Sequence, residues 1–152
     1  MDRAFVNLWQ GELCPNPGTN DRYWQWLDER EKKRAESFGN ESLRRHYVEV
    51  RGRLRLTLAQ WLNALPEEIL IELTQHGKPF LADYPGYAFN ISHSANFLAI
   101  AAGQNMQLGV DIEQCKSRAN LAGLVNKCFA EAEIAYWLKL AEPDHLSAFY
   151  RI

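Results

Sequence analysis

The chain has 152 residues, of which 47% are hydrophobic and 12% aromatic, so it can bury the core of one domain, and this composition excludes a disordered segment. Its formal net charge of −2 gives no general attraction to nucleic acid or to an anionic membrane, so any basic site must be a local patch. Cys14, Cys115 and Cys128 fit neither a zinc site nor a disulfide framework, and no run reaches the ~18 apolar residues of a membrane helix, so a cytoplasmic protein is expected.

The first third of the chain is predicted to contain a short strand and a helix. Residues 4–9 are apolar enough for a strand, and the proline- and glycine-rich residues 15–18 predict a loop after it. A helix is expected over 20–38, with a charged middle at 28–34 that lies largely in solvent. Its inward residues are expected to be Tyr23, Trp24, Leu27, Ala35 and Phe38.

The periodicity over 41–62 predicts a second helix, because apolar residues recur there at steps of three and four. Arg44, Arg51 and Arg55 fall beside this apolar stripe and, at ~100° per residue, project in nearly one direction. Two interpretations are open for them: an anion-binding surface, or a solvated basic face whose aliphatic stems cover the core. The residues of the stripe are Leu43, Tyr47, Val50, Leu54, Leu58 and Trp61.

Strands are predicted in the middle of the chain, where short apolar runs alternate with Ser, Asn and Gly, and helices at its end, where a three- and four-residue period returns. The last three strands are expected to form a small antiparallel meander. The strands are predicted over 69–74, 87–91, 97–102 and 107–113, and the helices over 121–125, over 131–140 and from Pro143 onward.

The last predicted strand carries a pair of acids. Its aliphatic residues alternate with Gly109, Asp111 and Glu113, so a strand would turn both carboxylates to the face opposite the core. Two acids on one face can share a cation, and oxygen ligands favour Mg²⁺. Gly109 leaves room for a bulky group to approach the backbone. The alternative is an edge strand that shows its charges to water.

His93 lies between Ser92 and Ser94 at the end of a predicted strand. A single histidine in such a place is more often a structural residue than a functional one. A serine-hydrolase site is excluded, because a nucleophile elbow needs the pattern Gly-x-Ser-x-Gly and residues 90–96 contain no glycine.

Four segments of the chain resemble the motifs of the Sfp-type 4′-phosphopantetheinyl transferases and follow one another in the same order as in that family. The resemblance runs through nearly the whole chain. It implies an α+β fold of two similar halves, with residues 1–105 forming the first half and 106–152 beginning the second. In that family a Trp-x-x-Lys-Glu segment follows the position reached by residues 149–152, so we expect the second half and the active site to be incomplete in this chain. The four segments are His76-Gly77-Lys78-Pro79, Phe89-Asn90-Ile91-Ser92-His93-Ser94, residues 108–113, and Phe129-Ala130-Glu131-Ala132-Glu133.

The resemblance implies transfer of 4′-phosphopantetheine from coenzyme A to a serine of an acyl, polyketide or peptidyl carrier protein. Asp111 and Glu113 would hold Mg²⁺ and, with Glu133, would be catalytic. Glu133 also lies in the first turn of a predicted helix, where an acid is favourable through the helix dipole, so a structural role is an equal alternative for it and for Glu131. The implied coenzyme A contacts are Arg51, Lys78, Pro79, Ser92 and His93, and weaker candidates are Arg34, Arg44 and Arg55.

Two alternative functions belong to other classes. The first is a non-catalytic fragment or binding module that retains part of a coenzyme A or carrier-protein surface. The second is nucleic-acid binding through the arginine helix, which is disfavoured because the charge balance is acidic and the sequence offers one short basic stripe.

Overall fold

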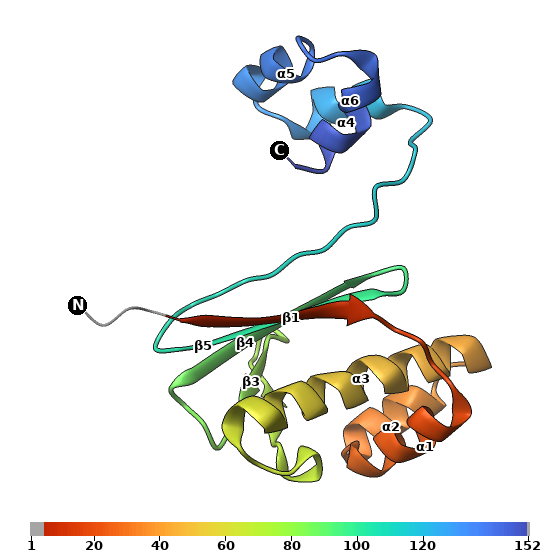
Figure 1. Ribbon diagram of the computed structural model, residues 1–152, viewed down its shortest axis with the longest axis vertical. Helices are drawn as coiled ribbons and strands as arrows, with labels where there is room; N and C mark the ends of the chain where they lie inside the picture. The colour runs from red at the N-terminus through yellow and green to blue at the C-terminus, as the bar shows by residue number, and fades with distance from the viewer. Residues whose placement is uncertain (1–4, 152) are drawn as a thin grey trace. The chain divides into compact units, whose positions relative to one another are not determined.

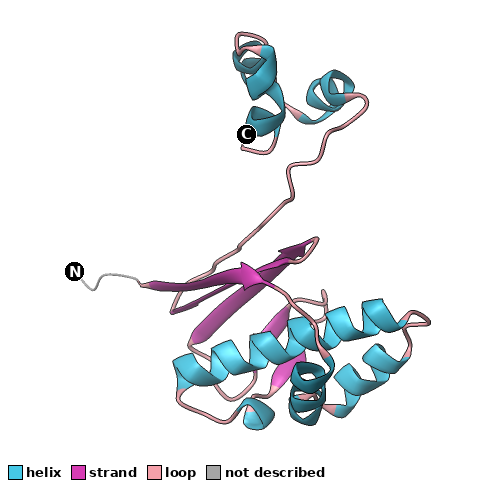
Figure 2. Cartoon of the chain, turned by 45° about the vertical axis from the view of Figure 1, so that its right-hand side comes forward, coloured by secondary structure: helices cyan, strands magenta, loops and turns pink. Residues whose placement is uncertain are grey.

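The computed structural model describes residues 5–151 and divides into two compact units, one ending at Ile112 and one beginning at Glu113. Each unit is described by itself. The first contains sheets and helices and the second contains helices (Figures 1 and 2), and the α+β class predicted from the sequence is confirmed. No helix among residues 5–151 is both long enough and apolar enough to cross a membrane.

The main sheet has three antiparallel strands in the order β1-β5-β4. The central strand pairs on one side through Leu8 with Ala101 and on the other through Ile91 with Ile100. The strands predicted near 4–9, 87–91 and 97–102 are therefore confirmed, with shifted ends, although Ala4 lies outside the described residues. Their bounds are β1 (Val6–Glu12), β4 (Tyr87–Ser94) and β5 (Phe97–Gln104).

The strand predicted over 107–113 is wrong. This segment has no regular secondary structure, and the chain runs back beside the sheet after β5 (Figure 1). The reason is that β5 is central: β4 pairs with one of its edges and β1 with the other, so no edge remains for the third strand of a meander. The backbone N–H groups of this segment bond to side chains of β4 instead.

The helix predicted over 20–38 is also wrong as a single element. It is two helices, α1 (Pro17–Trp26) and α2 (Glu29–Glu36), which meet at Asp28. Asp28 is the N-cap of α2: its carboxylate accepts from the Glu31 N–H, and the Glu31 carboxylate accepts from the Asp28 N–H. This reciprocal capping box fixes a new helix start where the hydrophobic period alone predicted continuity.

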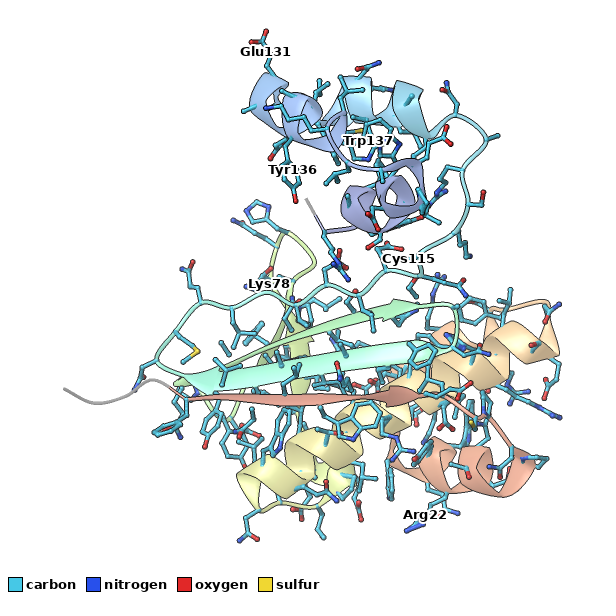
Figure 3. The ribbon with its side chains drawn as sticks, turned by 45° about the horizontal axis from the view of Figure 1, so that its top comes forward. Arg22, Lys78, Cys115, Glu131, Tyr136 and Trp137 are labelled. Carbon is cyan, nitrogen blue, oxygen red and sulfur yellow. The ribbon has the colours of Figure 1, made fainter. Side chains whose placement is uncertain are left out.

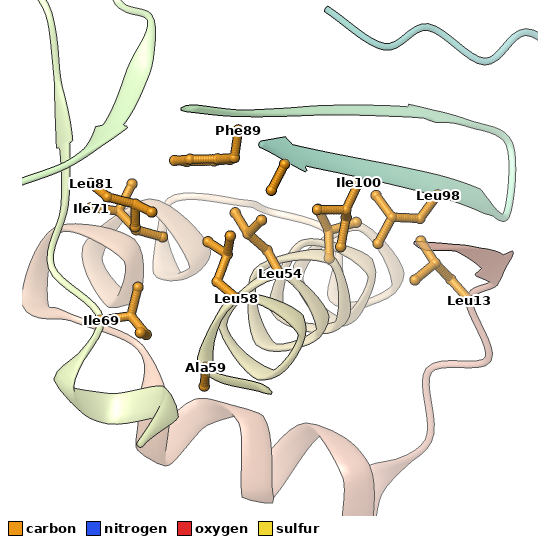
Figure 4. Close-up of a cluster of buried hydrophobic side chains, with 12 residues drawn as sticks. Leu13, Leu54, Leu58, Ala59, Ile69, Ile71, Leu81, Phe89, Leu98 and Ile100 are labelled. Atoms are coloured by element: carbon orange, nitrogen blue, oxygen red, sulfur yellow. The ribbon is translucent and has the colours of Figure 1, made fainter. Parts of the chain in front are cut away.

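The third helix, α3 (Glu41–Leu62), begins and ends where the sequence predicted. Asn40 caps its first turn, and its apolar stripe packs on one face of the main sheet. Figure 4 shows Leu54 and Leu58 of α3 facing Phe89, Leu98 and Ile100 of the strands. The predicted stripe is confirmed in this core from Val50 onward. Tyr47 packs instead on a separate cluster with α1 and α2, and Leu43 is 56% exposed.

A short 3₁₀ helix, η1 (Pro66–Glu68), follows α3 and leads into a hairpin of β2 (Ile71–Leu73) and β3 (Pro79–Leu81). The strand predicted over 69–74 is confirmed only for the three residues of β2. Arg55 of α3 joins this region to α2, because its guanidinium donates to the Glu31 carboxylate at 2.7 Å and to the Ile69 carbonyl at 2.8 Å. The solvated middle predicted for 28–34 is therefore wrong at Glu31, which is 5% exposed.

The second unit consists of α4 (Leu121–Cys128), α5 (Glu131–Trp137) and α6 (Glu142–Phe149), which confirms the predicted helices with shifted ends. Trp137, labelled in Figure 3, is buried with Val125 and Ala148. Its indole N–H donates to the His145 carbonyl at 2.9 Å, and its ring stacks on the His145 ring. One tryptophan thus joins α5 to α6.

Gly52→Ala is expected to lower the free energy of unfolding by ~1–3 kcal/mol, because a Cβ at Gly52 would overlap the Tyr23 ring where α1 crosses α3. The matched control is Gly39→Ala, since a Cβ there meets nothing within 4 Å. Urea unfolding of both variants measures the difference. Equal stability of the two variants would contradict this close contact between α1 and α3.

Candidate functional site

The outer face of β4 carries the polar residues that the sequence singled out. Phe89 and Ile91 point from β4 into the core, so the alternation of the strand turns Asn90 and Ser92 to the opposite face. Asn90 lies beside Ala101 of β5 and Ser92 beside Ala99. These small neighbours leave room for another segment of chain on this face.

The segment 110–112 occupies that face and is held by two side chains of β4. The Val110 N–H donates to Asn90 Oδ1 at 2.9 Å, and the Ile112 N–H donates to Ser92 Oγ at 3.2 Å. Each partner pair is 20 residues apart, so the segment runs parallel to β4. We call Asn90, Ser92 and the segment 110–112 the β4 clamp. It replaces the backbone ladder that a strand would have supplied.

Asp111 lies within the β4 clamp. The Ser92 hydroxyl donates to its Oδ1 at 2.8 Å, and the residue is exposed. A Cβ at Gly109 would meet nothing within 4 Å, so the space predicted beside the acid is present. Glu113, the second predicted metal ligand, follows in the chain as the first residue of the second unit.

The residues present suit a hard cation, although among residues 5–151 no three His, Cys, Asp or Glu side chains gather as a metal cluster. Mg²⁺ is usually bound through one or two carboxylates, with waters and substrate phosphates completing its shell. Asp111 offers such a carboxylate: one oxygen is oriented by Ser92, and the group is open to solvent. An Asp that Ser92 orients fits a site of this kind.

His93 lies next to Ser92 and touches a second histidine. Its ring centroid is 5.5 Å from that of His46 on α3. Burial lowers the pKa of His46, and the charge of His93 lowers this pKa further. An anion that accepts hydrogen bonds from both rings would oppose both effects, because each imidazolium can donate to it. The two rings are therefore a candidate anion site.

His46 is not among the site residues predicted from the sequence. It lies among the arginines of α3, and neither the hydrophobic period nor a motif distinguishes it from its neighbours. Its proposed role depends on where β4 crosses α3. The same end of α3 borders a pocket of about 500 Å³. The pocket is lined by Pro15, Glu41, Ser42, Arg45, His46 and Asn96, so Arg45 adds a second cation near the histidines.

Arg51 has a different environment from the one predicted. It forms an ion pair with Glu31, and its Nε donates to that carboxylate at 2.6 Å. It follows His46 by five residues, which places it ~140° around the helix. The structure thus does not bring Arg51 to His93, and its contact with coenzyme A stays a prediction. A pocket of about 240 Å³ beside it is also lined by Arg34 and Leu73.

The three weaker arginine candidates have partners of their own. Arg55 is 1% exposed, so it cannot meet a ligand, and that suggestion is wrong. Arg44 lies over the Trp24 ring at 5.1 Å, and Arg34 lies over the Phe38 ring at 5.0 Å.

Lys78 and Pro79 lie where the hairpin turns from β2 to β3. Figure 3 shows Lys78 there, and its side chain is exposed. Gly77 has φ of +78°, a conformation that favours glycine, and the Lys78 N–H donates to the Thr74 hydroxyl at 3.1 Å. These local interactions define the conformation of the turn. The contact of Lys78 and Pro79 with coenzyme A stays a prediction.

Glu133 has a structural role in the second unit. Its Oε2 accepts the Ala130 N–H at 2.7 Å and so satisfies an unpaired donor at the start of α5. This is the alternative that the sequence left open for it. The catalytic role of Glu133 stays a prediction.

Comparisons with known proteins confirm the family resemblance found in the sequence. A family profile described as "4′-phosphopantetheinyl transferase, N-terminal" matches residues 14–105. The chain is 30% identical over 149 residues to 4′-phosphopantetheinyl transferase HetI of Nostoc sp., covering 96% of this chain and 63% of that protein. It is 35% identical over 98 residues to 4′-phosphopantetheinyl transferase AcpT of Escherichia coli K12, covering 64% of this chain and 49% of that protein.

A third relative is the putative 4′-phosphopantetheinyl transferase slr0495 of Synechocystis sp., which is 26% identical over 147 residues. The match covers 92% of this chain and 58% of that protein. The chain thus spans about half to two thirds of the length of these three relatives.

Proposed function

This chain belongs to the 4′-phosphopantetheinyl transferase family, and from that premise we propose that its protein transfers 4′-phosphopantetheine from coenzyme A to a serine of a carrier protein. One observation carries the proposal: on β4, Ser92 bonds to Asp111 while the next residue, His93, touches His46. A carboxylate that can take a cation and an imidazole pair that can take a phosphate are thus attached to successive residues of β4, on opposite faces of the strand. Coenzyme A has phosphates at two separate places, so both groups have a partner.

The proposed reaction is a displacement at phosphorus. The carrier serine oxygen attacks the phosphorus that bears pantetheine, the bond from this phosphorus to the pyrophosphate bridging oxygen breaks, and adenosine 3′,5′-bisphosphate leaves with that oxygen. The serine proton passes to a carboxylate, for which Glu113 and Glu133 are the proposed candidates. Asp111 and Glu113 would hold Mg²⁺, whose contribution when bound is to neutralise the pyrophosphate charge.

The remaining residues would bind and orient coenzyme A. His93 and His46 would hold the 3′-phosphate, with Lys78 and Pro79 against the nucleotide end. Binding energy gained at that phosphate, away from the reacting atoms, would align the pyrophosphate with the serine.

The test is a transfer assay in which the full-length protein is mixed with labelled coenzyme A, Mg²⁺ and a panel of apo carrier proteins. Label should become covalently attached to at least one carrier, and a carrier with its modified serine changed to alanine should remain unlabelled. Label on no carrier of a panel that spans fatty-acid, polyketide and peptide synthesis would contradict the proposal.

His93→Ala and His46→Ala are each expected to reduce the preference for coenzyme A over dephospho-coenzyme A about tenfold or more, because a hydrogen bond to a charged group contributes roughly 1.5–3 kcal/mol. In the wild type this preference should also rise as the pH falls from about 8 to about 6, because the phosphate favours protonated imidazoles. The direction of this pH dependence follows from His46. Its pKa is lowered when no anion is present, so binding of the phosphate is accompanied by uptake of a proton and is favoured at lower pH.

Calorimetric titration with both nucleotides measures the preference. Gln104→Ala is the control, since Gln104 is exposed and pairs with Tyr87, at the opposite end of β4 from His93. If both mutants keep the wild-type preference at every pH, the imidazole pair binds something other than this phosphate.

A further inference from the structure

The hydrogen bonds of the β4 clamp assign Ser92 a different role from the phosphate contact that the family resemblance implies. A serine hydroxyl has one donor hydrogen. In this structure that hydrogen goes to Asp111 Oδ1 at 2.8 Å, and the oxygen accepts the Ile112 N–H at 3.2 Å. A phosphate oxygen can only accept, so Ser92 cannot donate to it while it holds Asp111.

We propose that Ser92, assisted by Asn90, is a positioning residue that fixes the Asp111 carboxylate for a divalent cation. This inference rests on the proposed function, because it takes the cation at Asp111 from it. Ser92 and Asn90 would orient Asp111, the metal ligand. His93, the next residue on β4, would bind the phosphate instead.

The need for positioning comes from the backbone around Asp111. Residues 107–118 have no regular secondary structure, so no strand or helix fixes this acid. Ordering an irregular residue costs backbone entropy, so a metal ion that had to order the segment would bind more weakly. Asn90 and Ser92 order the residues on both sides of Asp111 before any ion arrives.

The Ser92 hydroxyl also orients the carboxylate itself. It donates to Oδ1 and so fixes one oxygen of this exposed carboxylate. Hydrogen-bonded partners of metal-binding carboxylates are known to matter, since removing them typically reduces metal affinity or activity by ~10–100-fold. Ser92 therefore acts through Asp111 and not by touching substrate.

The experiment compares Ser92→Ala, Ser92→Thr and Asn90→Ala with His93→Ala in the full-length protein. The first readout is the affinity for Mn²⁺ alone, measured by electron paramagnetic resonance. The second is the preference for coenzyme A over dephospho-coenzyme A, measured without metal. Circular dichroism and thermal unfolding confirm that each variant is folded.

Ser92→Ala should weaken Mn²⁺ binding about tenfold and leave the nucleotide preference unchanged, whereas His93→Ala should do the reverse. Ser92→Thr retains the hydroxyl on a strand-compatible side chain and should restore the wild-type affinity for Mn²⁺. Asn90→Ala, which loosens one anchor and leaves Asp111 its hydrogen bond, should weaken Mn²⁺ binding less than Ser92→Ala.

Three outcomes would overturn the inference. Ser92→Ala could bind Mn²⁺ like the wild type, or it could lose the nucleotide preference as His93→Ala does, which would make Ser92 a phosphate contact. If the wild type binds no Mn²⁺ at all, the cation assignment of the proposed function fails together with the inference. In the first case, if the wild type still transfers pantetheine, the proposed function stands and the inference alone is overturned.

Discussion

Asp111→Asn in the full-length protein is expected to reduce Mg²⁺-dependent transfer by about 100-fold or more. The substitution removes the negative charge that would hold the cation, and each ~1.4 kcal/mol of lost transition-state stabilisation is a tenfold loss in rate. The fold should survive, because the asparagine side-chain oxygen can still accept the hydrogen bond from Ser92. The initial rate of carrier modification, measured across a Mg²⁺ titration, gives the effect.

The control is Asp83→Asn, which makes the same chemical change at an exposed acid in the turn between β3 and β4. It should transfer at the wild-type rate. An Asp111→Asn variant that turns over normally at limiting Mg²⁺ would show that the cation is held elsewhere.

Arg55→Met is expected to cost ~3–5 kcal/mol of unfolding free energy, the largest stability effect that the structure predicts. The side chain is 1% exposed, and its guanidinium donates to the Glu31 carboxylate and to the carbonyls of Pro66 and Ile69. Methionine fills much of the volume but leaves the buried Ile69 carbonyl and the part-buried Pro66 carbonyl without that donor. Glu31 keeps Arg51 as its remaining ion-pair partner.

Arg45→Met is the matched control on the same helix. Arg45 pairs with Glu41 at 2.9 Å on the surface, where such a pair contributes ~0–1 kcal/mol. Denaturant unfolding of both variants measures the contrast. Similar stabilities of Arg55→Met and Arg45→Met would mean that the bonds of Arg55 do not join α2 and α3 to the segment before β2.

The sequence predicted those elements whose period is long and whose caps are conventional. The helix over 41–62 is an example: its apolar residues recur over 22 residues between an Asn cap and a left-handed Asn63. The helix predicted over 20–38 failed because a hydrophobic period cannot show a capping box. From the sequence alone, Asp28 and Glu31 are expected to be solvated charges. In the structure both pair with Arg55, which lies 24 residues after Glu31 in the chain.

The candidate site was predicted in part. The alternation at 108–113 drew attention to Asp111, whose metal role stays a prediction. It could not show that β1 takes the free edge of β5, because that pairing joins residues about 90 positions apart in the chain. His46 escaped notice for the same reason, since its partner His93 lies on a distant strand. Short motifs identified the residues on β4, and long-range packing determined what they contact.

The most direct test of the account is intact-mass spectrometry of an apo carrier after incubation with the full-length protein, coenzyme A and Mg²⁺. The carrier chosen should be one that a known transferase modifies under the same conditions. The account predicts that the carrier gains the pantetheine arm with the wild-type protein, and that it stays apo with Asp111→Asn or when a chelator replaces Mg²⁺. Equal gain with the wild type and with Asp111→Asn would contradict the account.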